Sequence, residues 1–81
     1  MNADNRNKLL TRIEVKPEMM GGRPTIRGMR FPVSDVLELL ASGMTFQEIL
    51  DQHPLLEIDD IQAALLYASY RIKNTLIINA A

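Results

Sequence analysis

The chain changes its hydrophobic period within GGRPTIRGMRFPV, residues 21–33. Glycine reaches backbone angles that other residues avoid, and proline holds the residue before it in an extended conformation. Gly21, Gly22 and Pro24 therefore predict a sharp bend. Further along, Gly28 predicts a two-residue type II′ turn with Met29, because glycine suits the first central position of that turn.

A short β-hairpin is predicted around this turn, with residues 25–27 on one side and residues 30–32 on the other. Pro32 has no backbone N–H to donate, so its strand should end there. Upstream, residues 12–15 alternate polar and apolar side chains, which is typical of a strand with Ile13 and Val15 facing inward.

From Val33 onward the apolar residues recur with the 3.6-residue period of a helix. Val36, Leu37 and Leu40 continue the pattern. This predicts a first helix that is capped by Ser34 or by the residue before it, and that is ended by Gly43.

A second helix is predicted over residues 46–52, before Pro54. Thr45 and Glu48 have the spacing of a capping box, in which each side chain satisfies a backbone N–H of the other residue. The residues that this helix should bury are Phe46, Ile49 and Leu50.

A third helix is predicted from Ile58, with Glu57, Asp59 and Asp60 at its positive end. Leu66 and Tyr70 lie off its core stripe and form a second apolar face. The stripe expected to face the core comprises Ile58, Ile61, Leu65, Ala68 and Ile72.

These elements predict one mainly α domain: a homeodomain-like, three-helix, helix-turn-helix bundle with a short N-terminal β-hairpin. We expect residues 1–11 to be a flexible N-terminus, residues 12–73 to form the domain, and residues 74–81 to be an apolar tail that acts as a strand or an oligomer contact. Only 81 residues are available to build the core, so a partner subunit could add much of the stability. A homodimer or higher oligomer is therefore expected.

Charge is divided unevenly along the chain. Residues 1–32 contain seven Lys or Arg and three Asp or Glu, whereas residues 33–66 contain seven Asp or Glu and no Lys or Arg. Carboxylates at the start of the third helix would be repelled by phosphate, which argues against DNA reading by that helix. Arg23, Arg27 and Arg30 of the hairpin are the expected contacts to a partner or to nucleic acid, with Arg27 and Arg30 opposite one another. Two interpretations stay open: ion pairs with the chain's own acidic residues, such as Asp35 or Glu38, or contacts with an external acidic partner.

Several classes of function are not indicated by the sequence. The chain has no cysteine and one histidine, His53, so we expect no disulfide, no metal site and no catalytic triad. The glycines do not have the spacing of a phosphate-binding loop, and no cofactor is expected. The apolar runs are too short to span a membrane and no signal peptide is evident, which favours the cytoplasm.

A family resemblance rests on the glycine-rich segment and the helical pattern together. The chain resembles the bacterial domain-of-unknown-function 433 family from roughly Ile13 to Tyr70. The resemblance implies a homeodomain-like fold and an antitoxin role in a toxin-antitoxin system, since members are often paired with a PIN-like nuclease. It brings no catalytic residues. The matching segments are residues 21–33, 35–40, 43–45, 48–50, 54 and 60–65.

Two functional hypotheses follow. The first is a non-enzymatic, antitoxin-type binding protein that docks a PIN-like nuclease, associates with itself, or does both. Its surface would combine the Gly22–Arg30 hairpin with Leu66 and Tyr70 of the third helix. The alternative is a DNA-binding transcriptional regulator that contacts phosphates through Arg23, Arg27 and Arg30.

Overall fold

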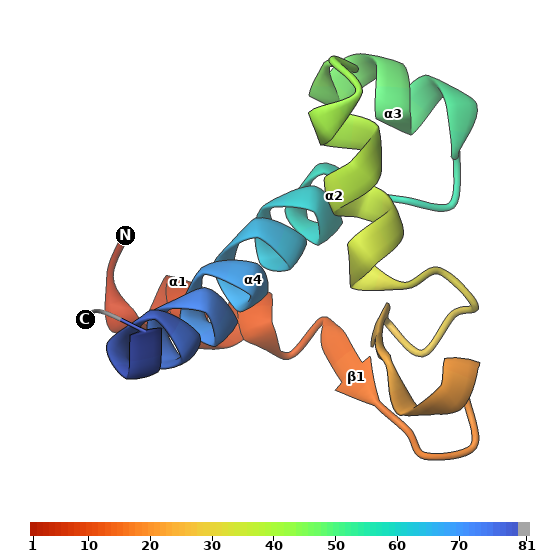
Figure 1. Ribbon diagram of the computed structural model, residues 1–81. Helices are drawn as coiled ribbons and strands as arrows, with labels where there is room; N and C mark the ends of the chain where they lie inside the picture. The colour runs from red at the N-terminus through yellow and green to blue at the C-terminus, as the bar shows by residue number, and fades with distance from the viewer. Residues whose placement is uncertain (80–81) are drawn as a thin grey trace.

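The computed structural model describes residues 1–79, with side chains as far as Lys73. Within this range the chain is mainly helical and carries one two-stranded antiparallel sheet (Figure 1). The elements in chain order are α1 (Ala3–Leu10), β1 (Ile13–Val15), the 3₁₀ turn η1 (Met20–Gly22), β2 (Pro24–Ile26), α2 (Val33–Ala41), α3 (Phe46–Gln52) and α4 (Ile58–Asn79).

The core lies where α2, α3, β2 and the N-terminal half of α4 meet. Burial of apolar surface is the main force that holds these elements together, at about 25 cal/mol for each Å² removed from water. Phe46 and Tyr67 pack against its edge. The buried cluster comprises Ile26, Val33, Val36, Ile49, Leu56, Ile61 and Ala64.

The ends of α2 and α3 follow the predicted signals closely. Gly43 has φ +96° after α2, and its N–H donates to Leu40 O while Met44 N donates to Leu39 O, the pair of bonds that defines a Schellman motif. The predicted capping box of α3 is confirmed, because Thr45 and Glu48 satisfy each other's backbone N–H groups. The cap of α2 differs from the prediction, since Pro32 holds the N-cap position.

The two strands pair differently from the predicted hairpin. β2 pairs with β1, with Ile26 opposite Ile13, and residues 25 and 32 form only an isolated bridge. The central turn residues are Arg27 (φ +47°) and Gly28 (φ +71°), and Met29 N donates to Ile26 O. Positive φ at both positions is the signature of a type I′ turn, so the predicted type II′ turn at Gly28 and Met29 is wrong.

The expectation of a flexible N-terminus needs correction, because α1 is a regular helix. Asn2 caps it by accepting from Asn5 N, and Leu9 is buried where α1 packs against α4. The inward side of β1 was also misassigned in part. Val15 is exposed, whereas Ile13 packs against the core.

The predicted core stripe of α4 is largely wrong. Ile61 is buried as expected, but Ile58, Leu65 and Ile72 are exposed. The helix instead turns Asp60, Ile61, Ala63 and Ala64 inward. The strand expected within the tail, residues 74–81, is wrong over residues 74–79 as well, because α4 continues to Asn79. The tail residues 80–81 lie outside the described part of the chain.

Candidate functional site

The Arg27 side chain reaches from the hairpin turn to the start of α4. Its Nε lies 3.1 Å and 3.2 Å from Asp60 Oδ1 and Oδ2, and its Nη2 lies 2.9 Å from Oδ2. Nη2 also donates to Leu55 O at 2.6 Å. A left-handed backbone costs a non-glycine residue roughly 1–2 kcal/mol. These bonds offset that cost by fixing the turn to the helix.

Asp60 is fully buried and all of its bonding capacity is used. Besides Arg27, it accepts from Arg12 Nη1 at 3.0 Å and from Glu57 N at 2.8 Å. Burial alone raises the pKa of this carboxyl. The hydrogen bonds from Arg27, from Glu57 N and from Arg12 outweigh burial and hold the pKa below its ordinary value.

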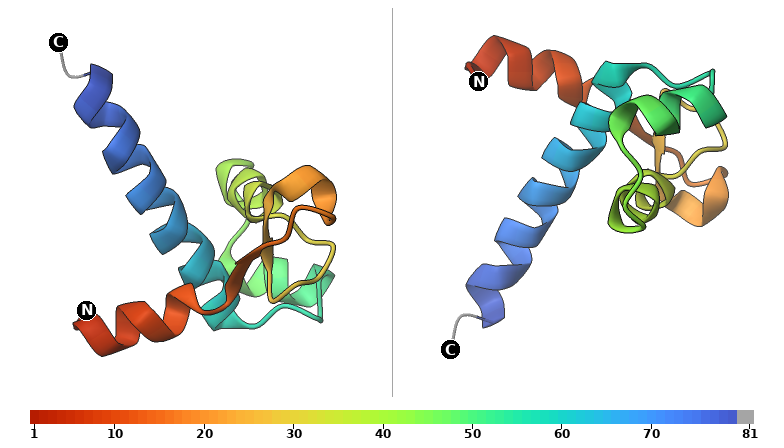
Figure 2. Two further views of the ribbon diagram at one scale, coloured as in Figure 1. Left: turned by 90° about the horizontal axis from the view of Figure 1, so that it is seen from below. Right: turned by 90° about the horizontal axis from the view of Figure 1, so that it is seen from above.

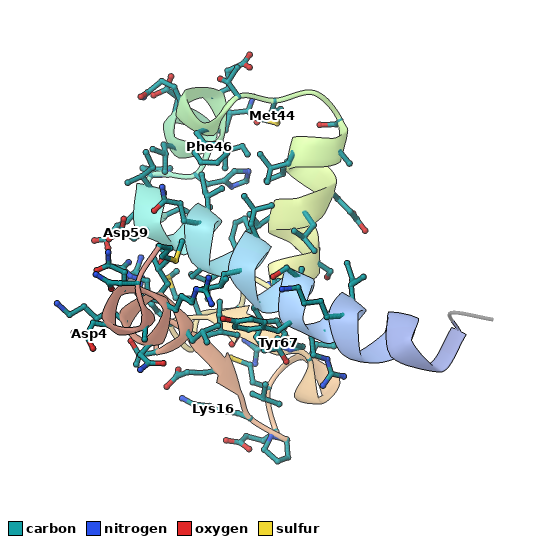
Figure 3. The ribbon with its side chains drawn as sticks, turned by 90° about the vertical axis from the view of Figure 1, so that its left-hand side faces the viewer. Asp4, Lys16, Met44, Phe46, Asp59 and Tyr67 are labelled. Carbon is teal, nitrogen blue, oxygen red and sulfur yellow. The ribbon has the colours of Figure 1, made fainter. Side chains whose placement is uncertain are left out.

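Arg12 was not singled out in the sequence, yet it completes this ion cluster. Its Nη1 lies 2.7 Å from Glu57 Oε1, and its Nη2 lies 3.6 Å from Asp59 Oδ2. Asp59 stands at the start of α4 beside α1 (Figure 3). The hydrogen bonds to Glu57 and Asp60 raise the pKa of Arg12. Of the two interpretations left open for Arg27, the internal ion pair is thus the observed one, with Asp60 in place of Asp35 or Glu38.

Arg30 lies apart from this cluster, beside an apolar groove. Arg27 stands inside the turn, so the two arginines do not form the predicted cross-strand pair. Among the side chains described up to Lys73, Arg30 has no ion pair, and Leu55, which also lines the groove, is 76% exposed. The groove has a volume of about 400 Å³ and is lined by Met29, Arg30, Phe31, Gln52, His53, Pro54, Leu55 and Leu56.

His53 has a structural contact in the wall of this groove. Its ring meets Phe31 edge to face, with ring centroids 5.1 Å apart. Its backbone N–H donates to Ile49 O at the end of α3. Over the described residues, no group of three His, Cys, Asp or Glu side chains is placed to hold a metal ion.

Arg23 borders a second groove, of about 270 Å³, between α2, β2 and α4. Its Nε donates to Met20 O at 3.2 Å, and no carboxylate in the described part of the chain pairs with it. Tyr67 lies on the side of α4 that faces this groove (Figure 3). The lining residues are Arg23, Pro24, Val33, Ser34, Leu37, Tyr67, Ala68, Arg71 and Ile72.

Leu66 and Tyr70 line neither groove. Leu66 borders a hollow with Met1, Gln62 and Leu65, and the Tyr70 ring has Lys73 Nζ 5.9 Å from its centroid. The structure therefore brings Tyr67, rather than the two residues selected from the sequence, to the basic hairpin.

The residues predicted to form turns, Gly21, Gly22, Pro24 and Gly28, lie in or next to bends of the chain. Gly21 (φ +67°) and Gly22 (φ +81°) adopt the left-handed conformation that produces the bend. Pro24 opens β2 opposite Val15, where a residue at the first position of a strand can do without an N–H. Gly28 occupies the second central position of the type I′ turn.

The fold and its charged groups define a small, mainly helical domain whose hairpin is joined to its longest helix by an ion cluster centred on the buried Asp60. Residues 13–68 match the family described as "Protein of unknown function (DUF433)", and the chain belongs to this family. None of the helices within residues 1–79 combines the length and apolar character needed to cross a bilayer.

Similarity also extends to a relative in sequence and to a solved structure. The uncharacterized protein y4eO of Sinorhizobium fredii (strain NBRC 101917 / NGR234) is 38% identical over 52 residues, which cover 64% of this chain and 24% of that protein. The chain thus spans about a quarter of that relative. The crystal structure of a DUF433 member protein from Anabaena variabilis ATCC 29413 matches with a TM-score of 0.71 and 23% identity, over 100% of this chain and 87% of that one. At this identity the likeness shows the fold alone.

Proposed function

We propose that the chain is a non-enzymatic, antitoxin-type binding protein that docks a PIN-like nuclease and also associates with itself. Docking would use the groove between the hairpin and the α3–α4 connection. The observation that carries this proposal is the combination of the exposed apolar side chain of Leu55 with Arg30, which has no ion-pair partner in the described structure. An apolar patch beside a cation suits a protein surface that carries apolar and acidic groups.

The internal ion cluster favours a protein partner over DNA. We propose that α2, α3 and the start of α4 form a homeodomain-like helix-turn-helix unit. In a DNA reader of this kind the start of the recognition helix meets the bases. Here that position holds Glu57 and Asp59, and the two arginines beside them are already bonded to carboxylates.

A nuclease is chemically suited to this surface. Nucleases that cleave phosphodiesters with metal ions hold those ions on carboxylates, so the region around their active site is acidic. Arg30 could pair with such a carboxylate while Leu55 fills an apolar recess. A contact of this kind would cover the nuclease active site and would explain inhibition.

Co-expression with a PIN-like nuclease encoded beside this gene tests the proposal. We expect the two proteins to co-purify and the cells to be protected from the nuclease. The double variant Arg30→Glu/Leu55→Ser should lose both effects. The matched control Arg6→Glu/Val15→Ser changes an exposed cation and an exposed apolar residue outside the groove and should keep both. Capture that is equal for the two variants would refute docking in the groove.

A second function, DNA-binding regulation, is favoured by the outward position of Arg23 and Arg30. Because Arg27 is bonded to Asp60, we expect two phosphate contacts in place of three. Each phosphate contact contributes about 0.9 to the slope of log affinity against log salt concentration. The Arg23→Ala/Arg30→Ala variant should therefore lower the slope for promoter DNA by about two, and the Arg6→Ala/Lys8→Ala control should not. If the Arg23→Ala/Arg30→Ala variant and the wild-type chain gave equal slopes, this function would be refuted.

A further inference from the structure

Three exposed apolar residues of α4 repeat at intervals of seven. Ile58, Leu65 and Ile72 are 50%, 41% and 54% exposed, although each is a large apolar side chain. Seven residues are close to two helical turns, so the three side chains lie in one stripe along the helix. A stripe with this period is typical of the seam between two packed helices.

In its N-terminal half, α4 is covered by the core on one face and by α1 on another. Ile61 and Ala64 face the core, and Leu9 of α1 is buried where α1 meets the N-terminal half of α4. Figure 2 shows that α1 and α4 diverge, and that the C-terminal half of α4 extends beyond the rest of the domain. A second helix could therefore lie along the exposed stripe.

We propose that this stripe packs against the same stripe of a second copy of the chain, with the two α4 helices antiparallel. The two-fold axis would pass beside Leu65, so that this residue meets its own counterpart. Ile58 of one copy would then meet Ile72 of the other. This interface would be isologous, since both copies use the same residues.

The charges beside the stripe select the antiparallel direction. At 100° per residue, Glu57 and Arg71 lie on one side of the stripe, and Asp59 and Lys73 lie on the other. In an antiparallel two-fold pair, each side of the stripe on one copy lies next to the same side on the other copy. This arrangement therefore brings Glu57 beside Arg71 of the second copy, and Asp59 beside Lys73 of the second copy.

A parallel pair would have the opposite effect. Its two-fold axis exchanges the sides of the stripe, so Glu57 would lie beside Asp59 of the second copy, and Arg71 beside Lys73. Like charges at such positions are unfavourable. The side chains of Glu57 and Asp59 are 60% and 52% exposed although both contact Arg12, which leaves them accessible to a second cation.

The inference rests on the self-association in the proposed function and not on the nuclease. Cysteine cross-linking tests it cleanly, because the chain contains no cysteine. A disulfide needs Cα atoms within about 4.4–6.8 Å. Under mild oxidation, Leu65→Cys should form a covalent dimer. Ile58→Cys and Ile72→Cys should cross-link when mixed, while Ile58→Cys alone should not. Val15→Cys is the control, since Val15 is exposed but lies on β1 and not on α4.

Charge reversal provides a second measurement. Lys73→Glu should weaken the dimer in sedimentation experiments, and Asp59→Lys/Lys73→Glu should restore it. Each exposed ion pair changes an association constant by about twofold to fivefold, and the symmetric dimer contains each pair twice.

The outcomes separate this inference from the proposed function. If the wild-type chain dimerises but Leu65→Cys cross-links no faster than Val15→Cys, self-association stands and the α4 interface is overturned. Self-cross-linking of Ile58→Cys would show a parallel pair and overturn the antiparallel arrangement. A wild-type chain that stays monomeric at about 100 µM removes self-association and this interface together. Capture of the nuclease is scored independently in the groove variants.

Discussion

Replacement of Asp60 by alanine is the most informative perturbation of the fold. The carboxylate is fully buried and accepts hydrogen bonds from Arg27, Arg12 and Glu57 N. Asp60→Ala would remove the acceptor that these donors share and would break the bonds between the hairpin turn and α4, although Arg12 keeps Glu57 and Arg27 keeps Leu55 O. The ion cluster is therefore expected to contribute to stability as a unit.

The expected cost can be worked from the exposure of the partners. Removal of one partner from a buried ion pair typically costs about 3–5 kcal/mol. Arg27 and Arg12 keep 35% and 26% of their side-chain surface exposed, so water can rehydrate them in part. The N–H of Glu57, whose bond to Asp60 is partly buried, adds about 1 kcal/mol when it is left unpaired. We therefore expect a loss of about 3 kcal/mol, against roughly 4–12 kcal/mol of total stability for a chain of this length.

Urea unfolding followed by far-UV circular dichroism measures this loss. With a slope near 1 kcal/mol per molar urea, the loss of about 3 kcal/mol should lower the midpoint of Asp60→Ala by roughly 3 M. Asp59→Ala is the matched control, because this neighbouring carboxylate is half exposed and, among the side chains described up to Lys73, pairs with Arg12 alone, at 3.6 Å. The free energy of unfolding of Asp59→Ala should fall by no more than about 0.5 kcal/mol. Equal midpoints for the two variants would refute the role assigned to Asp60.

Three further predictions concern the same fold. The pKa of Asp60 is lowered in the folded state, so its stabilising effect is complete above the ordinary Asp pKa of about 3.9 and is lost as the pH falls through the folded pKa. The free energy of unfolding, measured against pH, should show this loss below about pH 4. The variant Asp60→Asn should not show it. Thr45→Ala removes a bond of the capping box and should cost about 1 kcal/mol in urea unfolding, whereas Gln47→Ala on the exposed side of α3 should cost less. Arg27→Gly and Arg27→Ala should both destabilise the chain, because both lose the ion pair. The glycine variant should lose about 1 kcal/mol less, because glycine adopts a φ of +47° without strain. Equal losses for the two variants would contradict the strain assigned to this turn.

Local signals explain why the central helices were predicted well. Gly43 ends α2, and the capping box of Thr45 and Glu48 starts α3, so these boundaries depend on residues within a few positions of one another. The helix α1 also has local signals, in the cap Asn2 and in Lys8 of its last turn. The segment has no apolar stripe, however, so the sequence did not predict a helix there. Its main support is packing against α4, which local sequence does not reveal.

The orientation of α4 could not be predicted, for a different reason. A charged residue is normally assigned to solvent, so the stripe through Ile58, Leu65 and Ile72 was preferred as the core face. The partners that bury Asp60 lie 33 and 48 residues earlier in the chain. One signal was present, since Asp60 follows Glu57 at capping-box spacing and accepts from its N–H. Because Asp60 turns inward, the stripe formed by Ile58, Leu65 and Ile72 must face outward.

The division of charge in the sequence therefore has two physical origins. Arg12 and Arg27 are part of the fold, because they balance the carboxylates at the start of α4 and connect the N-terminal segment to it. Arg23 and Arg30 border apolar grooves and have no carboxylate partner in the part of the chain that the structure describes. A cation beside an apolar groove is a feature that stability does not require. Substitutions of the groove residues should therefore weaken binding and leave the stability of the fold unchanged. Substitutions elsewhere in the basic segment, at Arg12 or Arg27, should weaken the fold itself.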